Sequence, residues 1–408
     1  MPIRKRIKWT LFTAQSFGSA GFLVASTVTP IVGARLSGRP SWAGVPTAFY
    51  WGGAALFAMV WGRLMDPLGR RRTLTLGLSL GVVGAIVAAG AVMAGSFPGF
   101  VAGLLLMGGA NSSLQLARFM AGEVHQPEER GRAISTVVMG GTVGAVMGPG
   151  LVAPMSAVAE SFGRPGLSGP FMASSFFFLL GSLVVFALLR PDPRDVARAL
   201  AVEPGGPRGG LGATRSLATI VRDPGVVVAI VTMTLAQAVM TMQMVITSLH
   251  MSHNGHVLAS VAAVMSSHVF GMYALSMVAG RLADTWGRRP LIMGGATMLV
   301  ASTLGAAPSV AVLPLGASLL LLGVGWNCCY VGASALLSDR LSVPERSRVQ
   351  GVNDSLLTGT AAGGSLLSGV VFSHLGYTVM GLVCAVVATV PLILAWRLES
   401  TRASTETA

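Results

Sequence analysis

A charged segment occurs twice in this sequence. GRLMDPLGRRR covers residues 62–72, and GRLADTWGRRP covers residues 280–290. Each copy places an aspartate and consecutive arginines around a glycine. The planar guanidinium group of arginine can bind a carboxylate and backbone carbonyls at once, and glycine permits a tight turn that a side chain would crowd. The chemistry expected of each copy is therefore an ion-pair cluster at the end of a helix.

Two further acids could complete these clusters. Glu123 and Asp339 each stand at the end of a later apolar segment in their own half of the sequence. We predict that Glu123 joins the first cluster and Asp339 the second. The alternative is that the arginines only fix the orientation of the chain in a membrane, which would require neither the acids nor the glycines.

Polar side chains also occur inside long apolar segments. Asn111, Gln115 and Arg118 are spaced i, i+4 and i+7, so they share one face of a helix. Polar groups are costly in hydrocarbon, and those that remain are candidate functional groups. Arg118 either belongs to this face or pairs with the charge cluster at Glu123. The alternative for the amides is that they cross-link helices, at about 1 kcal/mol each.

Histidines are the other titratable candidates, because no aspartate or glutamate lies in the middle of an apolar segment. His268 lies about halfway along its segment, at the position that Tyr50 occupies in the first half. It could carry a proton or act as a structural hydrogen-bond donor. The segment HMSHNGH, with His250, His253 and His256, could hold a soft cation or form a solvated loop. We predict no metal site and no cofactor.

The composition identifies the elements that must position these groups. Of the 408 residues, 52% are hydrophobic and 11% are charged, against about 25% charged in a soluble domain. A helix of about 20 apolar residues crosses a membrane. We predict twelve such helices, at 9–32, 42–62, 73–93, 98–119, 134–157, 169–190, 225–249, 257–279, 291–309, 312–337, 352–372 and 376–396. The three cysteines lie in these spans, so no disulfide framework is expected.

The distribution of positive charge predicts the orientation of the chain. The formal net charge is +13, yet only Arg35, Arg39 and Arg164 fall on one side of the predicted spans. This asymmetry indicates that both termini are cytoplasmic in a multi-pass protein of the cytoplasmic membrane. It requires contact with lipid head groups at most, and no nucleic acid.

The sequence divides into two similar halves. We predict a six-helix bundle at 1–190, a cytoplasmic linker at 191–222 with a short amphipathic helix near 195–202, and a second bundle at 223–408. Gln15 matches Gln237 at an offset of 222, and GGAN ending at Asn111 matches GVGWN ending at Asn327 at an offset of 216. Parallel repeats of this kind are typical of transporters whose substrate binds near the midplane.

The sequence resembles the major facilitator superfamily over essentially its whole length. The charged segments match the family signature G-x-L-x-D-x-x-G-R-[RK], and the resemblance implies that each cluster is a conformational latch that breaks when the two bundles rock. The residues of the two expected latches are Gly62, Asp66, Gly69, Arg70, Arg71 and Glu123, and Gly280, Asp284, Gly287, Arg288, Arg289 and Asp339. The implied fold is an all-α membrane protein of two pseudo-symmetric six-helix bundles.

The resemblance also implies that the first and fourth spans of each bundle line a central cavity. The expected cavity residues are Gln15, Ser19, Asn111, Gln115, Arg118, Gln237, Thr241, His268 and Asn327. The arginine usual in the fourth span is absent, because Leu104 stands near its place.

Glycines of the fifth span resemble the signature of antiporters in this family. Gly140, Gly144 and Gly148 recur every four residues before Pro149, which suits close helix packing followed by a bend. Val152, Ala153 and Ser135 depart from the full signature, and ordinary small-residue packing is the alternative.

We therefore expect a monomeric secondary transporter that exports small amphipathic molecules in exchange for protons. The alternatives are an importer or facilitator of a polar or anionic metabolite held by Arg118, a metal or metal-chelate exporter, and a membrane receptor that does not transport. An enzyme is not expected, because no nucleophile with a base and no phosphate-binding loop occurs.

Overall fold

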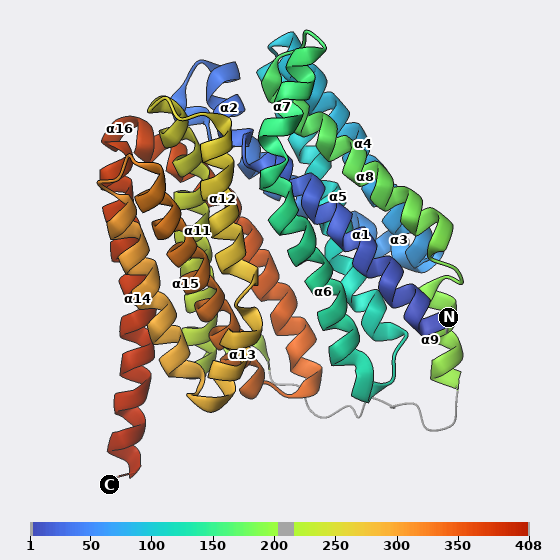
Figure 1. The fold of residues 1–408 in the computed structure, drawn as a ribbon. Helices are drawn as coiled ribbons and strands as arrows, with labels where there is room; N and C mark the ends of the chain where they lie inside the picture. Colours follow the sequence, from blue (N-terminus) through green and yellow to red (C-terminus); the bar gives the residue numbers. More distant parts are fainter. Residues whose placement is uncertain (1–2, 203–215, 407–408) are drawn as a thin grey trace. The chain divides into compact units, whose positions relative to one another are not determined.

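The computed structural model describes residues 3–202 and 216–406, and every regular element in these two ranges is a helix (Figure 1). The chain divides into two compact units. Unit 1 comprises residues 1–208 with 257–262, and unit 2 comprises residues 209–256 and 263–408. The change from unit 1 to unit 2 after residue 208 falls inside the predicted linker.

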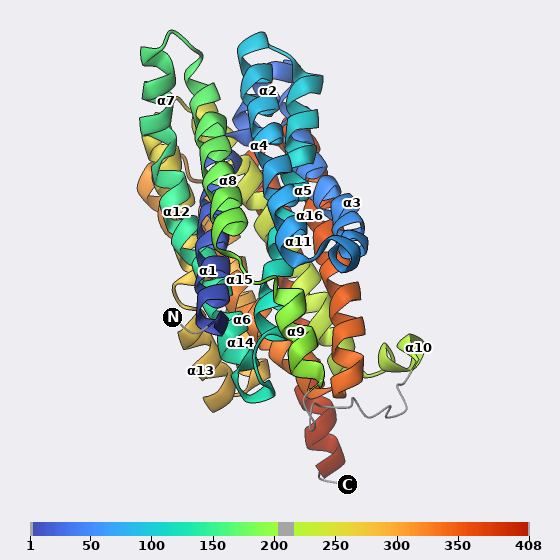
Figure 2. The ribbon, with the colours of Figure 1, turned by 90° about the vertical axis from the view of Figure 1, so that its right-hand side faces the viewer.

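Unit 1 is an all-helical bundle in which α1 packs beside α6 and α8, and α4 packs beside α5 and α8 (Figures 1 and 2). Its core is aliphatic and aromatic, with Leu74, Leu78, Phe100 and Phe178 fully buried. Its helices are α1 (Ile3–Ser26), α2 (Thr29–Ser37), α3 (Val45–Leu68), α4 (Arg70–Ala94), α5 (Phe97–Glu123), α6 (Pro127–Gly150), α7 (Val152–Ser161), α8 (Gly169–Leu188) and α9 (Pro193–Val202), with short 3₁₀ turns at Pro40–Trp42 and Gly166–Ser168.

Unit 2 has the same kind of core, between α11, α14, α15 and α16. Its helices are α10 (Leu217–Ile220), α11 (Pro224–His253), α12 (Leu258–Tyr273), α13 (Ser276–Thr285), α14 (Arg288–Ala306), α15 (Val312–Asp339) and α16 (Val343–Glu406). The first residues of α12, up to Ala262, belong to unit 1, and the rest of the helix belongs to unit 2. The long α16 is two helices, because Gly376 interrupts it with φ 77° and ψ 176°.

Each predicted span overlaps a helix or a pair of helices, and the predicted ends differ from the helix ends by up to ten residues, as at 396 against Glu406. Ten stretches of the described residues are long and apolar enough to cross a membrane. One of them, Val349–Arg397, is 49 residues long and contains the turn at Gly376, so it holds the eleventh and twelfth predicted spans. The ninth predicted span corresponds to α14, which has 19 residues and is not among these ten stretches. The linker helix α9 lies where an amphipathic helix was predicted.

Three spans are interrupted. The first breaks between α1 and α2, where α2 begins with Pro30 in its first turn. The fifth breaks at Leu151, directly after Pro149 and Gly150. The eighth breaks at residues 274–275, between α12 and α13. Proline disrupts the hydrogen bonds of the turn that precedes it, so Pro30 in α2 accounts for the first break and Pro154 in α7 for the second.

The duplication is visible in matching glycine contacts between the second and fourth spans of each half. A Cβ atom on Gly53 would lie under 3.0 Å from the carbonyl oxygen of Leu105, and one on Gly271 would lie as close to the carbonyl oxygen of Leu320. The two helices therefore touch backbone to backbone. These contacts relate the second spans by an offset of 218 and the fourth spans by an offset of 215.

A second pair of contacts gives the same offsets. A Cβ atom on Gly108 would clash with the carbonyl oxygen of Tyr50, and one on Gly323 with that of His268. The predicted equivalence of Tyr50 and His268 therefore agrees with the contacts.

The contacts correct the alignment of the fourth spans by one residue. At an offset of 215, Asn327 corresponds to Ser112, and both are almost fully buried. The predicted pairing of Asn111 with Asn327 is therefore wrong. The positions equivalent to Asn111 and Gln115 are those of Trp326 and Tyr330, so the same helix face carries amides in unit 1 and aromatic rings in unit 2.

Candidate functional site

Arg70 is the centre of the charge cluster in unit 1. Its Nη1 lies 3.0 Å from Asp66 Oδ1, and its Nε and Nη2 lie 3.2 and 3.4 Å from the two carboxylate oxygens of Glu123. Nη1 also donates to the carbonyl oxygen of Met65 at 3.3 Å. One guanidinium group thus bridges the end of α3 to the end of α5, as its fork geometry allows.

Arg288 builds the same cluster in unit 2. Its Nη1 lies 2.7 Å from Asp284 Oδ1 and 2.6 Å from the carbonyl oxygen of Ala283, and its Nε lies 3.1 Å from Asp339 Oδ2. The structure therefore brings the two acids named from the sequence, Glu123 and Asp339, to the two arginines. The role of these clusters as conformational latches stays a prediction.

Only one glycine in each charged segment is required by the backbone conformation. Gly69 (φ 86°, ψ 164°) and Gly287 (φ 98°, ψ 162°) adopt a backbone conformation that only glycine tolerates. A Cβ atom on Gly62 or Gly280 would meet no atom within 4 Å. Among the described residues, then, nothing packs closely on Gly62 or Gly280. Gly69 is required by the turn, and a Cβ atom there would also lie 2.5 Å from Asp192 Oδ2.

The unit 1 cluster is joined to the linker by an aspartate that the sequence reasoning did not select. The carboxylate of Asp192 accepts the backbone N–H groups of Arg70 and Arg71 at 3.1 and 3.0 Å, at the start of α4. Arg194 donates to the carbonyl oxygen of Asp66 at 2.9 Å. A carboxylate at a helix N-terminus is favourable. In the sequence, an acid between two prolines directly after the sixth span could have indicated this contact.

Arg71 binds elsewhere than its neighbour. Its guanidinium group donates to the carbonyl oxygen of Phe186 from Nε at 3.0 Å and from Nη2 at 2.6 Å, and it lies 4.9 Å from the centre of the Phe186 ring. This arginine therefore holds the end of α8 and takes no part in the contacts described for the cluster.

Replacing Asp192 by asparagine is expected to destabilise unit 1 modestly. The amide keeps one acceptor oxygen, so one backbone N–H at the start of α4 loses its partner, and the helix-end charge interaction is lost as well, together about 1 kcal/mol. Thermal unfolding of the detergent-purified protein measures this. Asp195→Asn is the control, because the carboxylate of Asp195 contacts only the side chain of Arg194 in the described interactions. Equal unfolding temperatures for the two variants would contradict this assignment.

The predicted polar residues of unit 1 lie on two helices. Gln15 and Ser19 of α1 face α6, because a Cβ atom on Gly141 would lie 3.4 Å from Gln15 Nε2 and 3.3 Å from Ser19 Oγ. On α5, Asn111 is half-buried and Gln115 is exposed.

Arg118 lies on the same helix as these two amides, and its guanidinium carbon lies 4.9 Å from the centre of the Phe119 ring. Glu123 is paired with Arg70. Whether Arg118 contacts substrate stays a prediction.

In unit 2, two polar residues named from the sequence form a chain with a tryptophan that was missed. Gln237 Nε2 donates to Thr241 Oγ1 at 3.3 Å, and Trp326 Nε1 donates to Gln237 Oε1 at 3.1 Å. Trp326 also stacks on Tyr330, with ring centres 5.0 Å apart and planes at 16°. The i, i+4 spacing of the two rings was the signal that could have found them.

Asn327 and His268 hold neighbouring segments of unit 2 together. Asn327 Nδ2 donates to Ser276 Oγ at 2.6 Å and to the carbonyl oxygen of Met272, directly beside the break between α12 and α13. His268 is fully buried and its Nδ1 donates to the carbonyl oxygen of Leu319 at 3.1 Å. Both contacts favour the structural alternative over direct contact with substrate.

His250 and His253 lie in the last turn of α11 and His256 follows that helix, and the three side chains contact separate partners. His250 and His256 donate from Nε2 to the carbonyl oxygens of Ser309 and Val310, at 3.1 and 2.8 Å. The ring of His253 lies 5.9 Å from that of Phe372. No group of three potential metal ligands occurs among the described residues, so this arrangement gives no support to a metal exporter.

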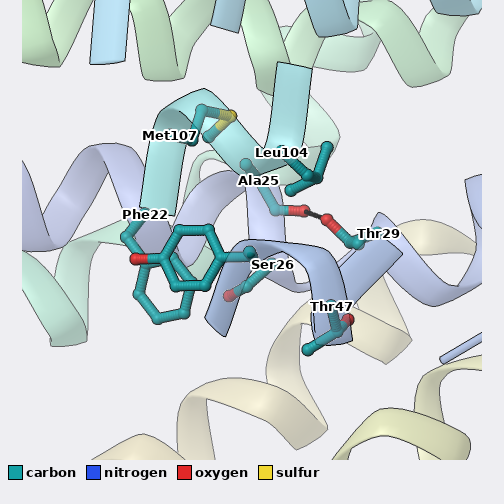
Figure 3. A pocket seen from close by; sticks show the side chains of 8 residues that line it. Phe22, Ala25, Ser26, Thr29, Thr47, Leu104 and Met107 are labelled. Atoms are coloured by element: carbon teal, nitrogen blue, oxygen red, sulfur yellow. Dashed lines mark hydrogen bonds between the residues drawn. The ribbon is translucent and has the colours of Figure 1, made fainter. Parts of the chain in front are cut away.

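A small cavity lies beside the break between α1 and α2 in unit 1 (Figure 3). Its lining includes Phe22, Ser26, Thr29 and Met107, and its volume is about 10 Å³. This is room for about one water molecule, so the cavity is too small to hold a substrate.

The glycine face of α6 packs directly on α1. Cβ atoms on Gly140 and Gly144 would lie under 3.0 Å from the carbonyl oxygens of Phe12 and Ser16, and one on Gly148 would lie 2.9 Å from Leu23 Cβ. This is the close helix contact expected from the four-residue spacing.

Comparisons with known proteins agree with this architecture. The sequence pattern of the Major Facilitator Superfamily matches residues 11–266 and 229–408. The chain is 35% identical over 384 residues to the uncharacterized MFS-type transporter YdeG of Bacillus subtilis (strain 168), covering 93% of this chain and 88% of that protein.

A second relative and a solved structure match over almost the whole chain. The riboflavin transporter RfnT of Brucella anthropi is 29% identical over 397 residues, covering 97% of this chain and 96% of that protein. The crystal structure of the nucleoside transporter NupG matches with a TM-score of 0.70 at 14% identity, covering 98% of this chain and 99% of that one, which shows the shared fold. The chain therefore belongs to the Major Facilitator Superfamily and is a multi-pass secondary transporter, not an enzyme.

Proposed function

We propose that this protein exports small amphipathic molecules by alternating access, in exchange for protons, as a monomer with both termini in the cytoplasm. The two charge clusters support alternating access, because the same three-residue arrangement occurs at equivalent helix ends of both halves. The excess of arginine and lysine on one side of the spans supports the orientation.

The observation that carries the direction of transport is the contact between α1 and α6. The glycines at positions 140, 144 and 148 allow the backbones of the two helices to touch, and the fifth span breaks directly after Pro149 and Gly150. A closely packed, bent fifth span matches the signature that resembles the antiporters of this family. The drug and proton antiporter group is therefore the subgroup that we propose.

Proton exchange requires a group that changes its charge, and His268 is the histidine near the middle of a predicted span. Its Nδ1 donates to the carbonyl oxygen of Leu319. We therefore propose that His268 has a structural role and that the exchanged proton binds to another group of the protein.

A second candidate function is the uptake of a polar metabolite. It is favoured by the similarity to RfnT over 97% of this chain, because that relative is named as a riboflavin transporter. In this case riboflavin is the first compound to test, and Arg118 would orient any anionic form of the cargo.

Transport into liposomes distinguishes these functions. The purified protein is reconstituted in one known orientation, and uptake of the amphipathic dye Hoechst 33342 and of riboflavin is measured with and without a pH gradient. The proposal predicts dye movement from the cytoplasmic side that is at least about tenfold faster with an opposing proton gradient and that stops when nigericin collapses it. Movement that ignores the gradient contradicts proton exchange, and movement of riboflavin alone toward the cytoplasmic side favours the second candidate.

A further inference from the structure

The fourth spans of the two halves differ at positions that the fold makes equivalent. In unit 1 the face of α5 carries Asn111 and Gln115. At the offset of 215 established by the glycine contacts, the same face of α15 carries Trp326 and Tyr330. The position equivalent to Arg118 is that of Ala333, so this face of unit 2 has no counterpart of that charge.

The rings of Trp326 and Tyr330 stack on each other, and a hydrogen bond orients the indole. Trp326 and Tyr330 stack almost parallel, with centres 5.0 Å apart, and the indole N–H donates to Gln237 Oε1 at 3.1 Å. Gln237 is itself 93% buried, since 7% of it is exposed, and its amide donates to Thr241. The ring pair is therefore anchored by a buried hydrogen-bond chain from α11.

Packing alone does not explain this arrangement. Aromatic residues that fill a core in this protein, such as Phe100 and Phe178, are fully buried. Trp326 and Tyr330 are only half-buried, although they lie on a helix whose neighbouring residues Asn327 and Cys329 are buried. A stacked pair that leaves part of its surface open provides a flat face for a further ring.

An anchoring role at the membrane surface does not explain it either. Aromatic residues of that kind gather at the two ends of a span. Trp326 is the fifteenth of the 28 residues of α15, about 20 Å from either end at 1.5 Å per residue. Its indole N–H donates to the amide of Gln237 on α11, and that amide is bonded in turn to the hydroxyl of Thr241; lipid would not favour polar groups at this depth.

We propose that Trp326 and Tyr330 form the stacking face of a ligand site in unit 2 that takes a flat, uncharged heteroaromatic ring with hydrogen-bonding edges. The ring of the ligand stacks on the aromatic pair, as bases stack on aromatic side chains. Gln237 Nε2 keeps a second hydrogen that can donate to an acceptor on the edge of the ring. This inference rests on the proposed transport function and names the class of molecule carried.

Binding of lumiflavin to the full-length purified protein tests the proposal. Lumiflavin is a flat, uncharged ring system whose fluorescence falls when it stacks on an indole or a phenol ring, so the stacked Tyr330 keeps the signal in variants that lack Trp326. We expect saturable quenching with the unmodified protein. Trp326→Ala is expected to raise the dissociation constant about 5- to 150-fold, because stacking contributes about 1–3 kcal/mol per ring. Trp326→Phe, which keeps a stacking face, is expected to lose less.

The matched control is Trp396→Ala, which removes an exposed tryptophan of the same unit and is expected to leave the dissociation constant unchanged. Thermal unfolding of each variant identifies a protein that has failed to fold, and Trp326→Phe keeps the test decisive in that case. Absence of saturable quenching, or equal affinity of the unmodified protein and both Trp326 variants, overturns the proposal. Gradient-driven export of Hoechst 33342 that persists in such a result would leave the proposed function standing and remove only the ring site.

Discussion

Gly144→Ala is expected to abolish transport and to lower the thermal stability of the protein. The added Cβ atom would lie under 3.0 Å from the carbonyl oxygen of Ser16 and the backbone nitrogen of Ala20, both on α1. Backbone atoms cannot swing aside as the end of a side chain can, so α1 and α6 must separate. Overpacking of this kind costs about 1–3 kcal/mol.

We expect Gly144→Ala to abolish transport even where the protein remains folded. Separating α1 from α6 also displaces Gln15 and Ser19, which lie beside Gly141 on the same α6 surface. The polar residues of α1 would then be misplaced by the width of a methyl group. Dye export from reconstituted liposomes and thermal unfolding of the purified protein measure the two effects.

Gly90→Ala is the matched control for this substitution. Gly90 lies inside α4 of the same unit, away from the break of the fifth span, and a Cβ atom there would meet no atom within 4 Å. We expect the control to transport like the unmodified protein and to unfold at nearly the same temperature. Similar behaviour of Gly144→Ala and Gly90→Ala would show that the contact between α1 and α6 is dispensable, and would remove the main support for the proposed direction of transport.

The membrane spans and the partners of the two arginines were predictable because their signals are local. A membrane span appears in the sequence as about 20 consecutive apolar residues, and the acids at positions 123 and 339 stand at the ends of such segments. The breaks near Pro149 and Pro30 follow from proline. The break between α12 and α13 has no proline at residues 274–275. Asn327 donates to Met272 and Ser276 on its two sides, and such a contact from another helix cannot be predicted from the local sequence.

Contacts between distant parts of the sequence were not predictable in this way. Asp192 reaches Arg70 across 122 residues, and Trp326 reaches Gln237 across 89 residues. The predicted pairing of Asn111 with Asn327 is wrong because the two asparagines are offset by 216 residues, whereas the fourth spans are related by an offset of 215. Only the glycine contacts fix the true offset, since close backbone packing depends on which residues face each other.

Arg70→Ala and Arg288→Ala are each expected to reduce transport at least about tenfold while leaving most of the folded protein intact. The ion pairs are partly exposed: the side chains of Asp66 and Asp284 are 82% and 75% accessible. Exposed pairs of this kind contribute about 0–1 kcal/mol to stability. Their loss therefore changes the balance between conformations more than it changes unfolding. Export rates from liposomes and thermal unfolding of the same preparations measure the two quantities.

Two substitutions separate the role in conformational change from a role in membrane orientation. Arg72→Ala removes a neighbouring exposed arginine, which lies outside the contacts described for the cluster, and we expect this variant to transport normally.

Arg70→Lys keeps the charge that orients the chain but loses the fork that reaches Asp66 and Glu123 together. If the cluster is a conformational latch, this variant fails like Arg70→Ala. If Arg70→Lys transports normally and only Arg70→Ala inserts with altered orientation, measured by labelling of cysteines at the termini, these arginines act through positive charge alone. The fork geometry at Arg70 and Arg288 would then be a consequence of the turn at Gly69 and Gly287, and the conformational latch would have to be sought elsewhere.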